Sequence, residues 1–120
     1  MILHVVPLDD WLAIPERPYA PQPFPKEGFV HCSPDEPTTL AVVNAYYRDT
    51  RGPLMALLID EDKLQVPVRW EPAGSAPPPG IAPGTLFPHV YGPIDRAAVE
   101  GLLEIRRDAD GRAVGFTPWA

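Results

Sequence analysis

With 120 residues, 45% of them hydrophobic, the chain is long enough for one domain with a sizeable buried core. A net charge of −6 without a Lys/Arg cluster argues against nucleic acid as a partner. No apolar run approaches the ~18 residues needed to cross a bilayer, and the N-terminus lacks the basic region of a signal peptide. Because Cys32 is the only cysteine, no internal disulfide is expected. We therefore expect a reduced, cytoplasmic protein.

The first half of the chain predicts two strands and two helices. Residues 2–6 form an apolar strand, and residues 9–12 follow as a short helix with Asp9 as its N-cap. Residues 28–32 predict a second strand. A longer helix over residues 38–48 follows, with Pro37 near its first turn and apolar side chains at helical spacing that pack on a sheet.

The second half predicts mainly strands. The continuous apolar run 54–59 is a central strand, residues 60–63 are a turn, and a strand over 66–70 is interrupted by Pro67. Residues 87–91 form a strand that Pro88 marks as irregular or as an edge. A short helix over 95–99 has Asp95 as its cap, and strands 102–107 and 112–116 flank an Asp-Gly hairpin turn at 108–111.

Proline is about three times as frequent as usual, with 18 residues. Two segments, 15–25 and 72–83, hold five prolines each, and both should be loops because proline lacks a backbone donor and fixes φ. Each segment precedes a histidine motif. Two interpretations stay open: loops that carry function, or surface excursions that proline makes rigid.

Strands outnumber helices, and the predicted helices are short and scattered. A doubly wound fold would need a long crossover helix after most strands, and only residues 38–48 qualify. The pattern therefore favours an α+β domain with a split or strongly bent, mixed β-sheet.

All three histidines lie in short apolar segments that predict buried or half-buried strands. They are His4, His31 and His89. A neutral imidazole both donates and accepts hydrogen bonds, and it also binds metals. If the three strands meet, the histidines form one polar pocket in a small core.

His31 and Ser33 point to one face of a strand, and Cys32 points to the other. We therefore expect His31 and Ser33 to work as a pair and Cys32 to be a core thiol. Pro34 ends the strand, which leaves Ser33 where a ligand can reach it. The alternative is a buried histidine satisfied by a backbone carbonyl and the serine hydroxyl.

His89 and Tyr91 share a strand face in the same way, and Gly92 after them allows close approach of a ligand or a backbone. The alternative is an aromatic packing cluster with Phe87.

Arg69 and Glu71 share a face just before the second proline-rich segment. They form an ion pair that contributes little, or Glu71 acts as a base or orients a ligand.

Metal and serine chemistry are less well supported by the pattern. Three histidines and Glu71 can form a zinc site with an open position, but no pair has the local spacing of metal ligands, so no metal is expected. Ser33 lies in no Gly-x-Ser-x-Gly turn. The chain also lacks the glycine-rich motifs of the common nucleotide-binding folds.

Four segments together resemble the bacterial domain-of-unknown-function family 952. They are the first strand with His4, then GFVHCS at 28–33, RWE at 69–71 and FPHVYG at 87–92. The match covers nearly the whole chain in this order and at suitable spacing.

That family is grouped with the ADP-ribosyltransferase-like fold. The resemblance implies a split β-sheet with short helices and a cleft that binds NAD, ADP-ribose or a related nucleotide-like small molecule. Segment 30–33 is similar to the His-Val-His-Leu-Ser stretch of RNA 2′-phosphotransferases, which share this fold. Typical transferases of the fold carry a catalytic glutamate late in the chain, where this sequence has His89 and Tyr91.

The resemblance also implies roles for individual residues. His4 and His31 would hydrogen-bond ribose or phosphate oxygens, and Ser33 would anchor the ribose. One of the side chains at 71, 89 and 91 would orient the nucleophile. We therefore predict catalytic roles for His31, His89 and Glu71, and ligand contacts from His4, Ser33, Tyr91 and Arg69.

Three interpretations of function stay open. The first is a transferase-like enzyme that cleaves the nicotinamide–ribose bond of an NAD-like substrate, with no further cofactor. The second is a non-catalytic module on a degenerate transferase fold that binds such a ligand. The third is a metal-dependent hydrolase that uses the three histidines. Phe116 and Trp119 near the C-terminus either cap the core or dock on a partner chain, so a homodimer is also open.

Overall fold

The structure is a computed structural model that describes residues 1–73 and 76–119. Seven strands in this part form two sheets, ordered β1-β3-β6-β7 and β2-β5-β4. The strands are β1 Ile2–Pro7, β2 Val30–His31, β3 Leu54–Ile59, β4 Val68–Pro72, β5 Leu86–Val90, β6 Val99–Arg107 and β7 Ala113–Pro118. The helices are α1 Leu8–Ala13 and α2 Glu36–Tyr46, with 3-10 turns η1 Glu61–Lys63 and η2 Arg96–Ala98.

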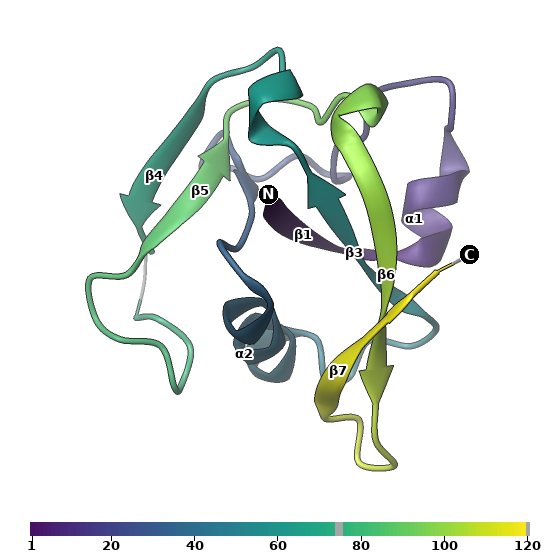
Figure 1. Ribbon diagram of the computed structural model, residues 1–120, viewed down its shortest axis with the longest axis vertical. Coiled ribbons are helices and arrows are strands. Elements are labelled where there is room, and N and C mark those ends of the chain that lie inside the picture. The colour runs from purple at the N-terminus through teal and green to yellow at the C-terminus, as the bar shows by residue number, and fades with distance from the viewer. Residues whose placement is uncertain (74–75, 120) are drawn as a thin grey trace.

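The α+β class and the split of the sheet are confirmed, and Figure 1 shows β4 and β5 standing apart from the larger sheet. The expected mixed sheet is wrong, because every strand pair among the described residues is antiparallel. No helix in this part of the chain is long and apolar enough to span a membrane.

The four-stranded sheet is covered on both faces, which explains the continuous apolar run of β3 and why β1 is apolar apart from His4. On one face, Met55, Leu57 and Ile59 pack against α1 and the smaller sheet. On the other face, Leu54 and Ala56 pack with side chains of α2 and β7. Alternation along β3 therefore fills two cores at once.

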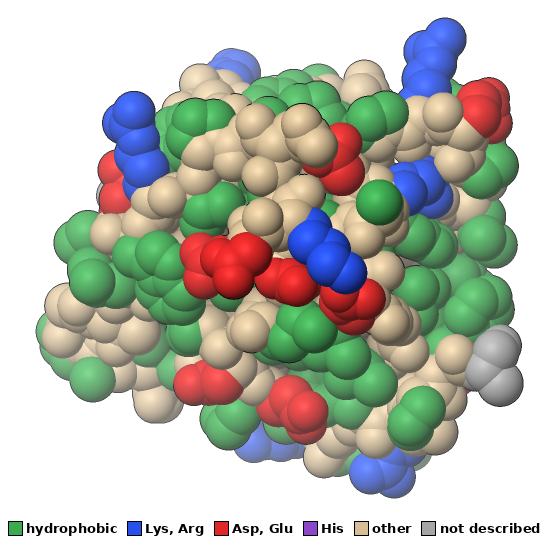
Figure 2. All heavy atoms as spheres, turned by 45° about the horizontal axis from the view of Figure 1, so that its top comes forward, with side chains coloured by type: hydrophobic (Ala, Val, Ile, Leu, Met, Phe, Trp, Pro, Cys, Tyr) green, Lys and Arg blue, Asp and Glu red, His purple; other side chains and the backbone are tan. Residues whose placement is uncertain are grey.

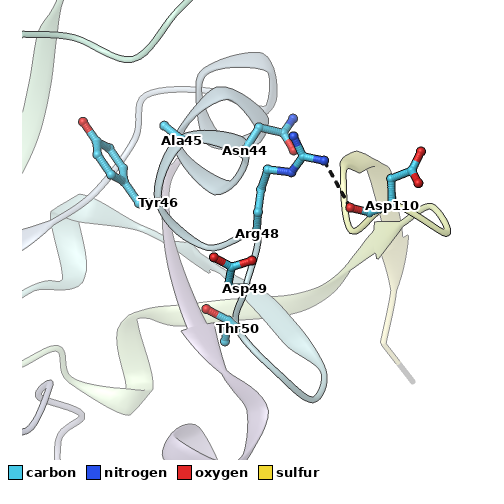
Figure 3. A pocket seen from close by; sticks show the side chains of 7 residues that line it. All are labelled: Asn44, Ala45, Tyr46, Arg48, Asp49, Thr50 and Asp110. Carbon is cyan, nitrogen blue, oxygen red and sulfur yellow. Dashed lines mark hydrogen bonds between the residues drawn. The ribbon is translucent and has the colours of Figure 1, made fainter.

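Helix α2 begins two residues earlier than predicted, because Asp35 caps it. The Asp35 side chain accepts a hydrogen bond from the Thr38 backbone N–H at 2.8 Å. Near the helix C-terminus, the Asn44 side chain exchanges two hydrogen bonds with the Ala113 backbone, and Arg48 donates to the Asp110 carbonyl (Figure 3). These bonds tie α2 to the β6–β7 hairpin.

Several predicted boundaries change for identifiable reasons. Strand β3 has the predicted bounds, whereas only Val30 and His31 of the predicted strand 28–32 pair with β5. The predicted strand 66–70 starts at Val68, after Pro67, and ends at Pro72. Asp9 is not the cap of α1, since the helix begins one residue earlier and Pro7 occupies that position.

The first proline-rich segment is held down at its start by Arg96. The Arg96 guanidinium donates to three carbonyl oxygens, those of Trp11, Ile14 and Arg17, at 2.6 to 3.0 Å. It also lies 4.1 Å from the centroid of the Trp11 ring. Tyr19 follows in the segment and pairs through its backbone with Ile94. Beyond Tyr19, the chain runs across to β2.

The two sheets join at the free edge of β1. The Leu3 and Ser33 backbones exchange hydrogen bonds of 2.9 and 2.7 Å, so the chain after β2 extends the edge of the larger sheet. This seam places His4 on β1 beside His31 on β2.

Candidate functional site

A cavity of about 380 Å³ lies at the seam between the two sheets. Its lining comes from β1, the end of α2, β2 with the residues after it, β5, and both proline-rich segments. The lining residues are His4, Val5, Pro21, Pro25, His31, Cys32, Ser33, Val42, Tyr46, Tyr47, Ala73, Pro78, Phe87 and His89. The three histidines therefore meet, as their apolar settings suggested.

His4 is buried and is held by a single hydrogen bond. Its Nδ1 lies 2.7 Å from the His31 carbonyl oxygen, so Nδ1 carries the proton and donates. The other nitrogen, Nε2, is then an acceptor, and no described residue donates to it. Burial lowers the pKa of His4 to about 4, so the ring is neutral at physiological pH.

The buried His4 makes stability depend on pH. The folded ring has a pKa of about 4 against an ordinary value of 6.5, so below pH 6.5 the unfolded chain binds more protons than the folded chain. The contribution of neutral His4 to the free energy of unfolding is fully present above pH 6.5 and falls as the pH drops towards 4. At pH 5 it has fallen by about 2 kcal/mol. Urea unfolding at pH 7 and pH 5 measures this loss.

The matched variant is His4→Asn, whose amide nitrogen can donate to the same carbonyl without titrating. Between pH 7 and pH 5, its free energy of unfolding should fall by about 2 kcal/mol less than that of the wild type. Equal losses in both proteins would show that His4 is not held neutral by burial.

His89 belongs to a hydrogen-bonded network with Glu71 and Tyr91. His89 Nδ1 lies 2.8 Å from Glu71 Oε1, and the Tyr91 hydroxyl donates to the same oxygen at 2.6 Å. The bond from Tyr91, and then that from His89, lowers the pKa of Glu71, and the bond to Glu71 raises the pKa of Tyr91. The carboxylate and the phenol therefore keep their acceptor and donor roles around neutral pH, and His89 presents Nε2 to the cavity.

The register of β4 on β5 creates this network. Arg69 pairs with His89 and Glu71 pairs with Phe87, so side chains of both strands meet on one face. Glu71 and Tyr91 are not among the lining residues; Glu71 contacts His89, and Tyr91 contacts Glu71. The Arg69 guanidinium lies 5.0 Å from the Tyr91 ring centroid and, among the described residues, forms no ion pair with Glu71.

Phe29 is a site residue that sequence reasoning missed. Its ring stacks on His89 with centroids 3.8 Å apart and planes 18° apart. It also contacts His31 and Tyr91, at centroid distances of 4.7 and 5.3 Å. An aromatic cluster is therefore present, but Phe29 is its centre. The signal was the position of Phe29 two residues before His31.

His31 is the exposed member of the three histidines. More than half of its side chain is accessible, and its Nε2 lies 3.7 Å from Glu27 Oε2. Burial lowers the pKa of His31, and the nearby Glu27 partly offsets this effect. Its ring centroid is 5.9 Å from that of His89. His31 therefore stands at the cavity mouth.

Ser33 and Cys32 occupy the positions that alternation predicted. Ser33 is buried and lines the cavity, and no described residue hydrogen-bonds its hydroxyl. Cys32 is buried in the core cluster, and burial raises the pKa of its thiol. Gly92 has a φ of 153°, and a Cβ there would lie 2.6 Å from the Val66 side chain, so its close neighbour is Val66.

A metal site built from the three histidines is not formed by the described residues. They contain no group of three His, Cys, Asp or Glu side chains placed to hold a metal ion. The Nδ1 atoms of His4 and His89 are instead engaged by a carbonyl and a carboxylate.

Near the C-terminus, Phe116 packs against the core that α2 covers, whereas the Trp119 side chain is 42% exposed.

Comparison with known proteins places the chain in a family. A family model described as "Protein of unknown function (DUF952)" matches residues 5–102. The crystal structures of protein CC0527 from Caulobacter crescentus and of its double mutant are similar, each with a TM-score of 0.74 over 94% of this chain and 92% of theirs. Their identities of 21% and 20% show a shared fold alone. No curated protein matches the chain. Because the family model spans most of the sequence, the chain belongs to the DUF952 family of proteins of unknown function.

Proposed function

We propose that this protein binds a nucleotide-like small molecule, related to NAD or ADP-ribose, in the histidine-lined cavity, and that His89 acts on it as a general base. One observation carries the proposal: a buried histidine lines the cavity while a carboxylate, Glu71, holds its Nδ1 at 2.8 Å. A base oriented by a third group is a recurrent feature of catalytic sites.

The network gives His89 the tautomer that a base needs. Donation from Nδ1 to Glu71 leaves the lone pair on Nε2, and the carboxylate stabilises the imidazolium that forms after proton uptake. The stacked Phe29 ring and the bond to Glu71 limit rotation of the imidazole. Glu71 and Tyr91 thus act through His89 as positioning residues, whereas the sequence motifs predicted a catalytic role for Glu71 and a ligand contact from Tyr91.

The cavity suits a ribose that carries a heterocyclic base. Its volume of about 380 Å³ is near the lower end of the ~300–1,000 Å³ usual for small-molecule sites. It therefore takes a nucleoside-sized part of a ligand. His4 and Ser33 offer polar atoms for ribose hydroxyls, and Val42, Phe87 and the prolines offer apolar surface for the base.

The reaction under this proposal is hydrolysis or transfer at the ribose carbon of a nicotinamide–ribose bond. The nucleophile, water in the simplest case, attacks that carbon, and the carbon–nitrogen bond breaks with its electron pair moving to the nicotinamide ring nitrogen. His89 Nε2 accepts the proton that the water loses. His31 at the mouth and His4 inside hold ribose oxygens during this step.

The ADP-ribosyltransferase-like fold that the sequence motifs imply is part of this proposal. The split of the strands into sheets of four and three, with a cavity at their seam, supports it.

A ligand-binding module without turnover is the second candidate. No Asp or Glu is among the described lining residues, so no carboxylate directly faces the positive charge that develops on the ribose.

A thermal-shift experiment with NAD, ADP-ribose and a 2′-phosphorylated nucleotide tests binding. A ligand at 100 times its dissociation constant adds about 2.7 kcal/mol, which raises Tm by roughly 8 °C or more for a chain of this size. The shift should disappear in His31→Ala and His89→Ala, each compared with its own ligand-free Tm. The absence of a shift with all three ligands and with the phosphate-free nicotinamide riboside would contradict the proposal.

An assay that measures nicotinamide release by chromatography distinguishes the enzyme from the binding module. Steady release that His89→Ala abolishes identifies an enzyme, and binding without release identifies a module.

A further inference from the structure

The described residues that line the cavity include no lysine or arginine. All ten lysines and arginines of the chain fall within the described residues, and none of them lines the cavity. Sites that bind phosphate usually present arginine, lysine or a free helix N-terminus to it.

Of the cationic residues near the lining residues in sequence, Lys26 is exposed and does not line the cavity, and Arg48 and Arg69 are directed elsewhere. Arg48, just beyond α2, donates to the Asp110 carbonyl, and Figure 3 shows it extending towards Asp110 while Tyr46 extends away from both. Arg69 lies over the outer network, 5.0 Å from the Tyr91 ring centroid.

The N-terminus of helix α2, near Ser33, is already occupied by a side chain. Helix α2 begins three residues after Ser33, and the Asp35 carboxylate already accepts a hydrogen bond from its first turn. This carboxylate occupies the position that an anion would use and adds a negative charge there.

Two carboxylates lie against histidines of the site. Glu71 holds His89 from behind, and Glu27 lies beside His31 at the mouth. Acidic residues outnumber basic ones by 16 to 10 in the chain, and Figure 2 shows acidic side chains gathered on one face. A phosphate dianion entering the cavity would lose hydration and gain no opposite charge.

From this distribution we infer that the cavity takes a phosphate-free nucleoside, and that a 5′-phosphate weakens binding. The inference rests on the proposed function and names its substrate class. His4 Nε2 and the Ser33 hydroxyl meet the ribose hydroxyls, His89 Nε2 remains free for the attacking water, and the carboxylates nearby tolerate a neutral or cationic base.

Calorimetry on the full chain with nicotinamide riboside and nicotinamide mononucleotide tests this, because the two probes differ only in one phosphate. The riboside should bind at least about tenfold more tightly at low salt, and the ratio should shrink as salt screens the repulsion. Equal or tighter binding of the mononucleotide would overturn the inference and leave the proposed function standing. Failure of the riboside, the mononucleotide, NAD and ADP-ribose to bind would overturn both.

A variant that adds a positive charge beside the cavity provides a second test of the inference. Tyr46 lines the cavity and is 62% exposed, so a long polar side chain fits there without disturbing the core. Tyr46→Arg should shift the affinity ratio towards the mononucleotide by about tenfold, while the neutral control Tyr46→Gln should not shift it. An unchanged ratio in Tyr46→Arg would show that missing positive charge is not what disfavours phosphate.

Discussion

Replacing Leu57 by alanine is expected to lower the free energy of unfolding by about 3 to 4 kcal/mol. Leu57 is fully buried on β3, in the core between the larger sheet and the smaller one. Its removal leaves a cavity where the two sheets pack, and the surrounding side chains come from different strands and cannot all move in together. Urea unfolding measures the loss, and Tm should fall by roughly 10 °C or more.

Leu86→Ala is the matched control for that substitution. Leu86 also lies on a strand, β5, but is 47% exposed. Its replacement by alanine should lower the free energy of unfolding by less than about 1 kcal/mol. Similar losses for Leu57→Ala and Leu86→Ala would show that the sheets do not pack over β3 as described.

Replacing Glu71 by glutamine is expected to reduce kcat/KM for nicotinamide release by about 100-fold if the protein is an enzyme. The substitution removes the charge that stabilises a protonated His89. The amide can also donate to His89 Nδ1, which would move the proton to Nε2 and remove the base. Binding of the nucleoside should change much less, because Glu71 lies outside the lining.

Glu104→Gln makes the same chemical change at an exposed position on β6, in the other sheet. Its kcat/KM should match that of the wild type. Equal activity of Glu71→Gln and Glu104→Gln, with both proteins folded, would rule out an orienting role for Glu71.

Local patterns predicted the parts of the fold that local physics decides. The run 54–59 has the bounds of β3 because a strand covered on both faces is apolar throughout. The Asp-Gly turn at 110–111 joins β6 to β7 as expected. Alternation predicted that His31 and Ser33 lie at the cavity and that Cys32 packs in the core, where it is buried although it also borders the cavity.

The features of the site that local sequence patterns did not predict depend on long-range contacts. Whether Glu71 faces the cavity or stands behind His89 depends on the register of β4 on β5, which no pattern within either strand specifies. Arg96 lies some 80 residues from the carbonyls that it binds. Phe29 lies just before β2, and nothing in the local sequence shows that the fold stacks its ring on His89.

Nuclear magnetic resonance of the histidine ring nitrogens, with and without a nucleoside ligand, tests the central claim most directly. The account predicts that nicotinamide riboside shifts the Nε2 signals of His4 and His89, while Nδ1 of each stays protonated on its carbonyl or carboxylate partner. Ring signals that do not move under conditions where calorimetry shows binding would place the ligand elsewhere and contradict the account.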